Sequence, residues 1–174
     1  GEMISERNIG HTYMFGGDFE DGAARVGTAA LGAVFTTEKG KDYYRISEIL
    51  PGVSWDDRYR SPLAEPGVPI AEGDYLLAID GVPVKVGDNV YAHLVDKGRQ
   101  MVSLTTNSSA STKGAVTTRV RALNSEFGLR YRHWVDGNLA HVTTASDSRI
   151  GYIHLPNMGE NGLVEFGRSY YPQT

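Results

Sequence analysis

Two apolar runs open the part of the chain that shows a clear pattern. Residues 26–37 read VGTAALGAVFTT and residues 42–50 read DYYRISEIL, with the turn-forming EKGK between them. Short apolar runs on either side of a polar turn that contains glycine are typical of a β-hairpin. We therefore expect two antiparallel strands in this region.

The next segment changes from loop to strand. Residues 51–74 are rich in proline, glycine and aspartate, and predict a loop with at most a short helix around 61–65, where Ser61 and Pro62 form a good helix start. Residues 75–84 read YLLAIDGVPV, in which Asp80-Gly81 is a strong turn signal. This pattern predicts a pair of strands joined at that turn.

A helix and two further strands complete this region. Asp88 is placed to cap a helix over 89–98 that ends at Gly98. Its apolar side chains Val90, Tyr91, Leu94 and Val95 share one face. The alternating patterns of 101–107 and 115–123 predict two half-buried strands joined by a polar loop.

From Ser125 onward the apolar spacing becomes helical. We expect a long helix from about 125 to 142, a strand at 149–156 and a short helix at 158–171. A strand and a helix at this point look like the opening of a second domain.

Composition limits the classes of function. The 174 residues carry a formal net charge of -4, which would repel a nucleic-acid backbone rather than attract it. The absence of cysteine excludes disulfides, thiolate metal sites and a cysteine nucleophile in this chain. No apolar stretch approaches the roughly 20 residues that cross a bilayer, and the start lacks a signal-peptide pattern. We therefore expect neither nucleic acid nor membrane as a partner, and the abrupt start at GEMISERNIG suggests a fragment.

The order of elements between 25 and 123 resembles a PDZ domain. The stretch SPLAEPGVPIAEGDYLLAIDGVPV is similar to PDZ modules of bacterial and archaeal proteases, with Gly73-Asp74 and Asp80-Gly81 at the expected separation. The resemblance implies an α+β fold, a small PDZ-like β-barrel or sandwich with two helices, flanked by segments of peptidase core domains.

A PDZ module binds an extended peptide along the edge of a strand, with the terminal carboxylate held by backbone N–H groups of a small-residue loop. The matching loop residues here are Leu31, Gly32 and Ala33, and the facing helix offers Tyr91 and Leu94 as wall residues. The alternative is an ordinary tight strand start, with Leu94 in the core and a groove that is closed and only structural.

The flanking segments extend the resemblance to the tricorn protease family, serine peptidases related to tail-specific proteases. GHTYMFGGDF precedes the module, and RYRHWV through RIGYIHLPNMG follows it. The resemblance implies that 1–24 end a histidine-bearing core domain, that 25–123 form the PDZ domain, and that 124–174 begin an α/β domain that carries the nucleophile.

The same resemblance implies a role for His11. This histidine matches the family's catalytic base, which accepts a proton from a serine nucleophile. Family members often have a serine just before this histidine, where this chain has Gly10. The nucleophile and its glutamate partner would follow Thr174, and no serine here lies in a G-x-S-x-G elbow, so we expect this chain alone to be inactive.

The remaining histidines show no ligand-like spacing, so neither a metal nor another cofactor is expected; they are His93, His133, His141 and His154. By resemblance, the partners are peptide substrates or C-termini, and the intact protein is a cytoplasmic homo-oligomer. The rival reading is a stand-alone PDZ module that recognises C-termini and performs no catalysis.

Overall fold

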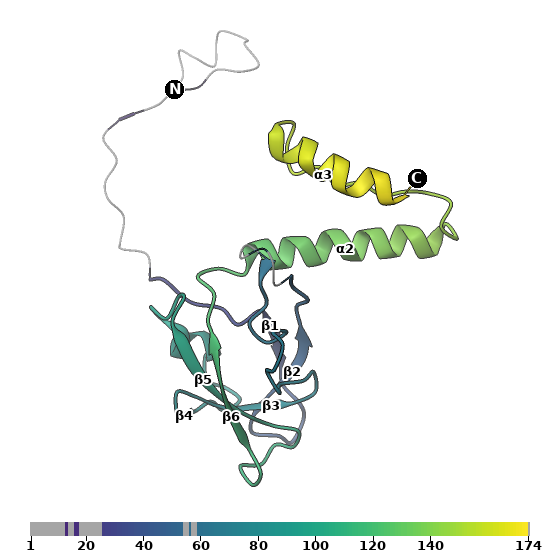
Figure 1. Ribbon diagram of the computed structural model, residues 1–174. Helices are drawn as coiled ribbons and strands as arrows, with labels where there is room; N and C mark the ends of the chain where they lie inside the picture. The colour runs from purple at the N-terminus through teal and green to yellow at the C-terminus, as the bar shows by residue number, and fades with distance from the viewer. Residues whose placement is uncertain (1–12, 14–15, 18–25, 54–55, 57–58, 174) are drawn as a thin grey trace.

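The protein consists of an antiparallel sheet domain and two helices that follow it in the chain (Figure 1). The computed structural model describes residues 13, 16–17, 26–53, 56 and 59–173, and His11 lies outside them. The long helix α2 crosses one end of the sheet domain, and α3 lies beside α2 on the side away from the sheet.

Six strands form one sheet in the order β1-β2-β3-β5-β6, with β4 paired to β3. Every pairing is antiparallel. The strands are β1 (Ala33–Thr36), β2 (Tyr44–Ile49), β3 (Tyr75–Ile79), β4 (Val82–Pro83), β5 (Met101–Asn107) and β6 (Val116–Arg121). The α+β class and all the predicted strand pairs in this domain are therefore confirmed.

The sheet is not a closed barrel. Its two ends approach each other where Ala30 and Leu123 exchange backbone hydrogen bonds of 2.9 Å in both directions. The strands themselves do not continue this pairing, and β1 pairs with β2 alone among the described strands. The first predicted strand is also shorter than 26–37, because the chain bends at Gly32 before β1 begins.

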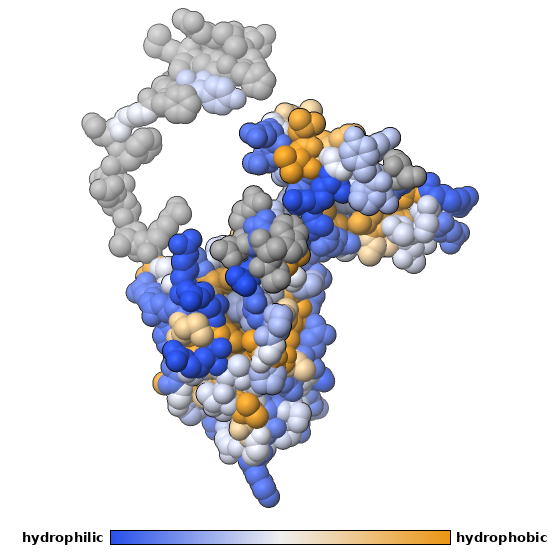
Figure 2. Space-filling model, viewed as in Figure 1, coloured by the Kyte–Doolittle hydropathy of each residue, from blue (hydrophilic) through white to orange (hydrophobic). Residues whose placement is uncertain are grey.

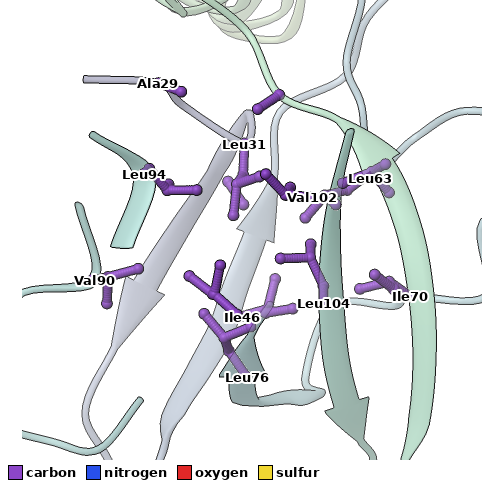
Figure 3. Close-up of a cluster of buried hydrophobic side chains, with 14 of the residues drawn as sticks. Ala29, Leu31, Ile46, Leu63, Ile70, Leu76, Val90, Leu94, Val102 and Leu104 are labelled. Atoms are coloured by element: carbon purple, nitrogen blue, oxygen red, sulfur yellow. The ribbon is translucent and has the colours of Figure 1, made fainter. Parts of the chain in front are cut away.

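One apolar core lies between the strands and the segments that pack on the sheet (Figure 3). Along β5, Val102, Leu104 and Thr106 are buried and alternate with more exposed neighbours, as the two-residue period of a strand requires. Ile46, Leu76 and Leu94 are 0% exposed and meet the β5 residues in this core. The alternation seen in the sequence thus determines which face of the sheet is covered.

Two predicted helices of the sheet domain differ in the structure. The expected helix 89–98 is a short 3₁₀-helix, η2 (Val90–Leu94), and Asn89 caps it by accepting the Tyr91 N–H at 3.0 Å. Asp88 instead accepts the Lys85 N–H at 2.8 Å, which closes the preceding turn. The expected helix near 61–65 is a series of turns, since its hydrogen bonds do not continue beyond single turns.

After the sheet domain come α2 (Phe127–Ala145), α3 (Glu160–Tyr170) and the 3₁₀-helix η3 (Tyr171–Gln173). The segment 149–156, predicted as a strand, is extended but pairs with no strand among the residues that the structure describes, and it runs back along α2. The Asn138 side chain donates to the Tyr152 hydroxyl at 3.0 Å, and the His154 ring packs on Trp134 at 5.0 Å. The prediction of a strand here was wrong, because this segment packs its side chains on α2 instead of forming backbone hydrogen bonds with another strand.

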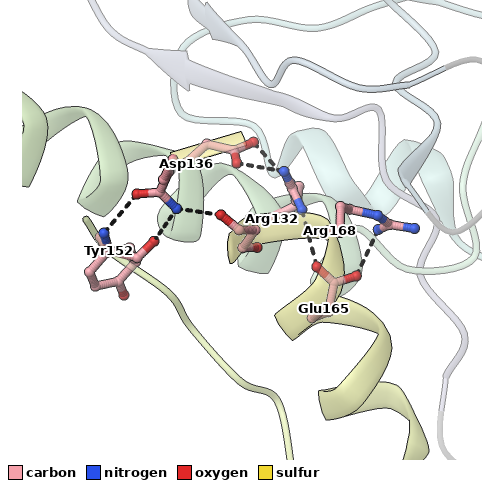
Figure 4. A network of polar contacts seen from close by, with 7 residues as sticks. Arg132, Asp136, Tyr152, Glu165 and Arg168 are labelled. Carbon is pink, nitrogen blue, oxygen red and sulfur yellow. Dashed lines mark hydrogen bonds and ion pairs between the residues drawn. The ribbon is translucent and has the colours of Figure 1, made fainter. Parts of the chain in front are cut away.

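An ion pair joins α2 to α3 and is flanked by a pair within each helix (Figure 4). Arg132 contacts Asp136 on its own helix at 2.9 Å and Glu165 of α3 at 3.6 Å. Glu165 also accepts from Arg168 at 2.7 Å. Arg132 and Glu165 therefore connect the facing surfaces of the two helices.

The turn between β3 and β4 contains a carboxylate with two donors. Asp80 and Gly81 both have positive φ, 49° and 79°, as a tight hairpin turn requires. The Asp80 side chain accepts from Lys97 and from the Ser103 N–H at 2.7 Å. The hydrogen bond from Lys97, followed by that from Ser103, lowers the pKa of Asp80 below its usual 3.8.

This lowered pKa predicts an acid-dependent contribution to stability. The stabilising contribution of Asp80 is fully present above the pKa of this carboxyl in the unfolded chain. It is lost as pH falls through the lowered pKa of the folded protein. Asp80→Asn should therefore lower the free energy of unfolding at neutral pH by about 1 kcal/mol or less, since the side chain is partly exposed. The difference from the parent should shrink as pH falls from about 5 to about 2 in denaturant titrations.

Lys97→Met should reproduce this pattern, because Lys97 is the largest cause of the lowered pKa. Lys113→Met, in the exposed loop between β5 and β6, is the matched control and should behave as the parent. A constant difference between Asp80→Asn and the parent across that pH range would contradict the assignment.

Candidate peptide-binding groove

Strand β1 leaves one edge of the sheet open. It pairs with β2 on one side, and no described strand pairs with its other side. An unpaired strand edge presents a row of backbone N–H and C=O groups that another extended chain can bond. The feature needed for peptide addition is therefore present at β1.

A groove separates this edge from η2. It has a volume of about 230 Å³ and combines apolar walls with a few polar groups. The lining residues are Val34, Phe35, Tyr44, Asp88, Asn89, Val90, Tyr91 and Arg130. The Tyr44 hydroxyl donates to the Asp88 carbonyl at 2.9 Å and accepts the Gly87 N–H at 3.3 Å, so it holds the loop that leads into η2.

The loop at the start of β1 is fixed by burial on both sides of a glycine. Leu31 and Ala33 are each 1% exposed, and the Gly32 carbonyl accepts the Leu50 N–H at 2.9 Å. Gly32 has φ of +69°, a conformation that residues with a Cβ rarely adopt. A Cβ at this position would also lie 2.9 Å from Leu129 Cδ2, so the loop requires glycine for two reasons.

The first turn of α2 covers this loop. Glu126, the residue before the helix, accepts the Gly32 N–H through Oε2 at 3.1 Å. Its other oxygen, Oε1, accepts from Arg130 at 2.6 Å from Nε and 2.5 Å from Nη2. Further along α2, His133 Nε2 lies 2.8 Å from Glu48 Oε1 of β2. These contacts attach α2 to the β1 end of the sheet.

The predicted binding residues fall into two groups. Leu31, Gly32 and Ala33 form the loop as expected, and Tyr91, 40% exposed, lines the groove. Leu94 is 0% exposed and belongs to the core instead of the groove wall, because η2 turns this side chain inward. Their roles in binding remain predictions.

Sequence reasoning did not single out Glu126 or Arg130. Their spacing of four residues at the start of a predicted helix is a signal for an ion pair, and it was available in the sequence. The contact with Gly32 was not, because the two residues are 94 positions apart.

A wider hollow than the groove lies elsewhere on the surface, at the opposite end of the strand order. It measures about 840 Å³ and is bordered by β5, β6 and the loop before β3, with Arg60, Arg99, Arg119 and Arg121 in its lining. Arg60 forms an ion pair with Glu65 there. This hollow does not reach the open edge of β1.

In the part of the chain that the structure describes, no group of three or more histidine and carboxylate side chains is placed to hold a metal ion. In the same residues, no helix is both long and apolar enough to span a membrane.

An antiparallel sheet whose glycine loop leads into an open edge strand, with a short helix across the groove, defines a PDZ domain. The family description that matches is the tricorn protease PDZ domain, over residues 29–125. The chain belongs to the tricorn protease family, and this region is its PDZ domain.

Similarity to relatives covers almost the whole chain. A tricorn protease homolog of Saccharolobus solfataricus is 35% identical over 169 residues, which is 97% of this chain and 15% of the relative. The tricorn protease of Thermoplasma volcanium is 34% identical over 176 residues, 99% of this chain and 16% of the relative. The chain therefore spans about a sixth of the length of these relatives.

A solved structure shows the same architecture. The crystal structure of the tricorn protease matches with a TM-score of 0.77 and 30% identity, over 97% of this chain and 16% of that one. The fold and its flanking helices are thus those of the corresponding region in the tricorn protease.

Proposed function

We propose that the intact protein is a serine-type peptidase of the tricorn family and that His11 is its general base. The observation that carries this proposal is the similarity over nearly the whole chain to proteins named tricorn protease. A serine hydroxyl is a weak nucleophile until a neighbouring imidazole accepts its proton. His11, in the stretch GHTYMFGGD, is the residue of this chain that matches that role.

The helices after the PDZ domain support a second part of the proposal, that 124–174 begin the nucleophile-bearing domain. Large apolar side chains are exposed on and before α3 (Figure 2). Met158 is 96% exposed, Leu163 72% and Val164 54%. Such a surface is expected to be covered by other parts of a larger protein. We extend the proposal, from the family alone, to a cytoplasmic homo-oligomer, with 1–24 in the histidine-bearing domain.

The third part concerns the groove, which we propose binds extended peptides. A peptide strand would add to the free edge of β1 by backbone hydrogen bonds, while the apolar groove selects side chains. The same groove would serve the rival function, a PDZ module that binds C-termini without catalysis. Peptidase activity of the intact protein distinguishes a peptidase from such a non-catalytic module.

The 174-residue chain alone should show no peptidase activity. Because the nucleophile is proposed to lie outside these 174 residues, the chain should not hydrolyse fluorogenic peptides or react with a fluorophosphonate probe. Intact-mass spectrometry after probe treatment is the measurement. Stoichiometric labelling of any serine in the chain would overturn this part of the proposal.

In the intact protein, His11→Ala should lower kcat by about three orders of magnitude or more, with a smaller change in KM, because a general base acts in the transition state. Steady-state kinetics on a peptide substrate measure both. His154→Ala, a histidine packed on Trp134 far along the chain, is the matched control and should keep most activity. Near-native turnover by His11→Ala would make that residue structural.

Peptide addition should be visible at β1. Titrating the chain with an extended peptide library should shift the amide NMR signals of Ala33–Thr36. Tyr91→Ala should weaken binding about threefold to tenfold, since a partly exposed ring contributes on the order of 1 kcal/mol. Tyr171→Ala, in η3 and 74% exposed, is the control and should leave binding unchanged. Unmoved β1 signals at millimolar peptide would remove the binding role.

A further inference from the structure

We propose that Glu126 is an internal ligand of the PDZ loop at 31–33, so that docking of α2 and binding of a free peptide C-terminus are mutually exclusive. The proposal rests on the groove assigned above. It adds that the carboxylate end of this groove is filled by the protein's own chain.

The Glu126 carboxylate occupies one backbone donor of the loop. Glu126 Oε2 accepts the Gly32 N–H at 3.1 Å, at the point where the chain enters the open edge strand. A peptide that adds to β1 with its C-terminus at the loop would need the same donor, because it is the N–H of the small-residue loop. One N–H cannot serve both carboxylates at full strength.

The surroundings of Glu126 favour the internal carboxylate. Its side chain is only 13% exposed, and Arg130 contacts Oε1 through two nitrogens. This pairing offsets the cost of burying the charge, as charge-assisted contacts of a carboxylate with a guanidinium do. Arg130 also lines the groove, and its guanidinium is already paired with Glu126.

Apolar contact reinforces the same arrangement. Leu129, 1% exposed, approaches Gly32 so closely that a Cβ there would lie 2.9 Å from its Cδ2. The His133–Glu48 contact holds the next turn of α2 to β2. The loop is therefore covered by one continuous helix surface, which a C-terminal peptide would have to displace.

The loop also has a further polar group at hand. Ser61 is 3% exposed, and its hydroxyl has no hydrogen-bond partner among the described residues. Its Oγ lies 3.3 Å from the position of a Cβ on Gly32. A hydroxyl with no partner in the described part of the chain therefore lies close to Gly32, on the side of the loop that Leu129 covers.

A shared donor makes the two events thermodynamically linked. A peptide C-terminus that takes the Gly32 N–H must release Glu126, and release of Glu126 weakens the hold of α2 on the sheet. Binding of a peptide C-terminus in the groove would therefore loosen the attachment of α2 to the sheet. Extended segments that do not place a carboxylate at the loop would leave α2 docked.

The test compares peptides with a free C-terminus and the same peptides amidated. The probe is an unselected C-terminal peptide library, titrated against the 174-residue chain and its Glu126→Ala variant, with affinities and the Gly32 and β1 amide signals recorded. The parent should bind the two forms equally. Glu126→Ala should prefer the free acid by about tenfold, the effect of one charge-assisted hydrogen bond.

Glu160→Ala is the matched control, since Glu160 lies exposed in the first turn of α3, and it should behave as the parent. Glu126→Gln keeps the size of the side chain, removes its charge, and is titrated in the same way in case Glu126→Ala does not fold.

Two failures are distinguishable. If both peptide forms shift β1 but neither Glu126 variant prefers the free acid, the internal-ligand proposal is wrong and the groove stands. A parent that already prefers the free acid would also overturn it. If neither form moves β1 in any variant, the groove and the internal ligand are both wrong.

Discussion

The left-handed backbone at Gly32 is the constraint on which the arrangement of the protein depends. With φ of +69°, Gly32 lets the chain pass from the buried Leu31 into β1, and the absence of a Cβ admits Leu129 of α2. The Gly32 carbonyl is bonded to Leu50, next to β2, and its N–H to Glu126. One residue therefore connects the core, the open strand edge and the helix that follows the sheet domain.

Local patterns in the sequence were sufficient for most of the sheet. The Asp80-Gly81 turn, the alternation along β5 and the glycine-bearing turn before β2 each have a cause within a few residues, and the structure confirms the strands they predict. The short helix η2 was harder, because helical spacing does not separate an α-helix from a single 3₁₀ turn. Leu94 was placed on the groove for that reason, although it faces the core.

Contacts between distant segments account for what the sequence could not show. Whether 149–156 forms a strand depends on a neighbouring strand with which it can pair, and these residues pack against α2 instead. The approach of Glu126 to Gly32 depends on the whole sheet domain, which brings the end of β6 back to Ala30. His11, recognised only by family resemblance, lies outside the described residues, so its role stays a prediction.

Amide hydrogen exchange at Gly32 tests most directly whether Glu126 holds α2 on the PDZ loop. The account predicts that the Gly32 N–H is protected in the chain and loses that protection in Glu126→Ala, while the Leu50 N–H stays protected. If Gly32 instead exchanges as fast as Gly114 in the exposed loop between β5 and β6, or keeps its protection without Glu126, the hydrogen bond is not what docks the helix.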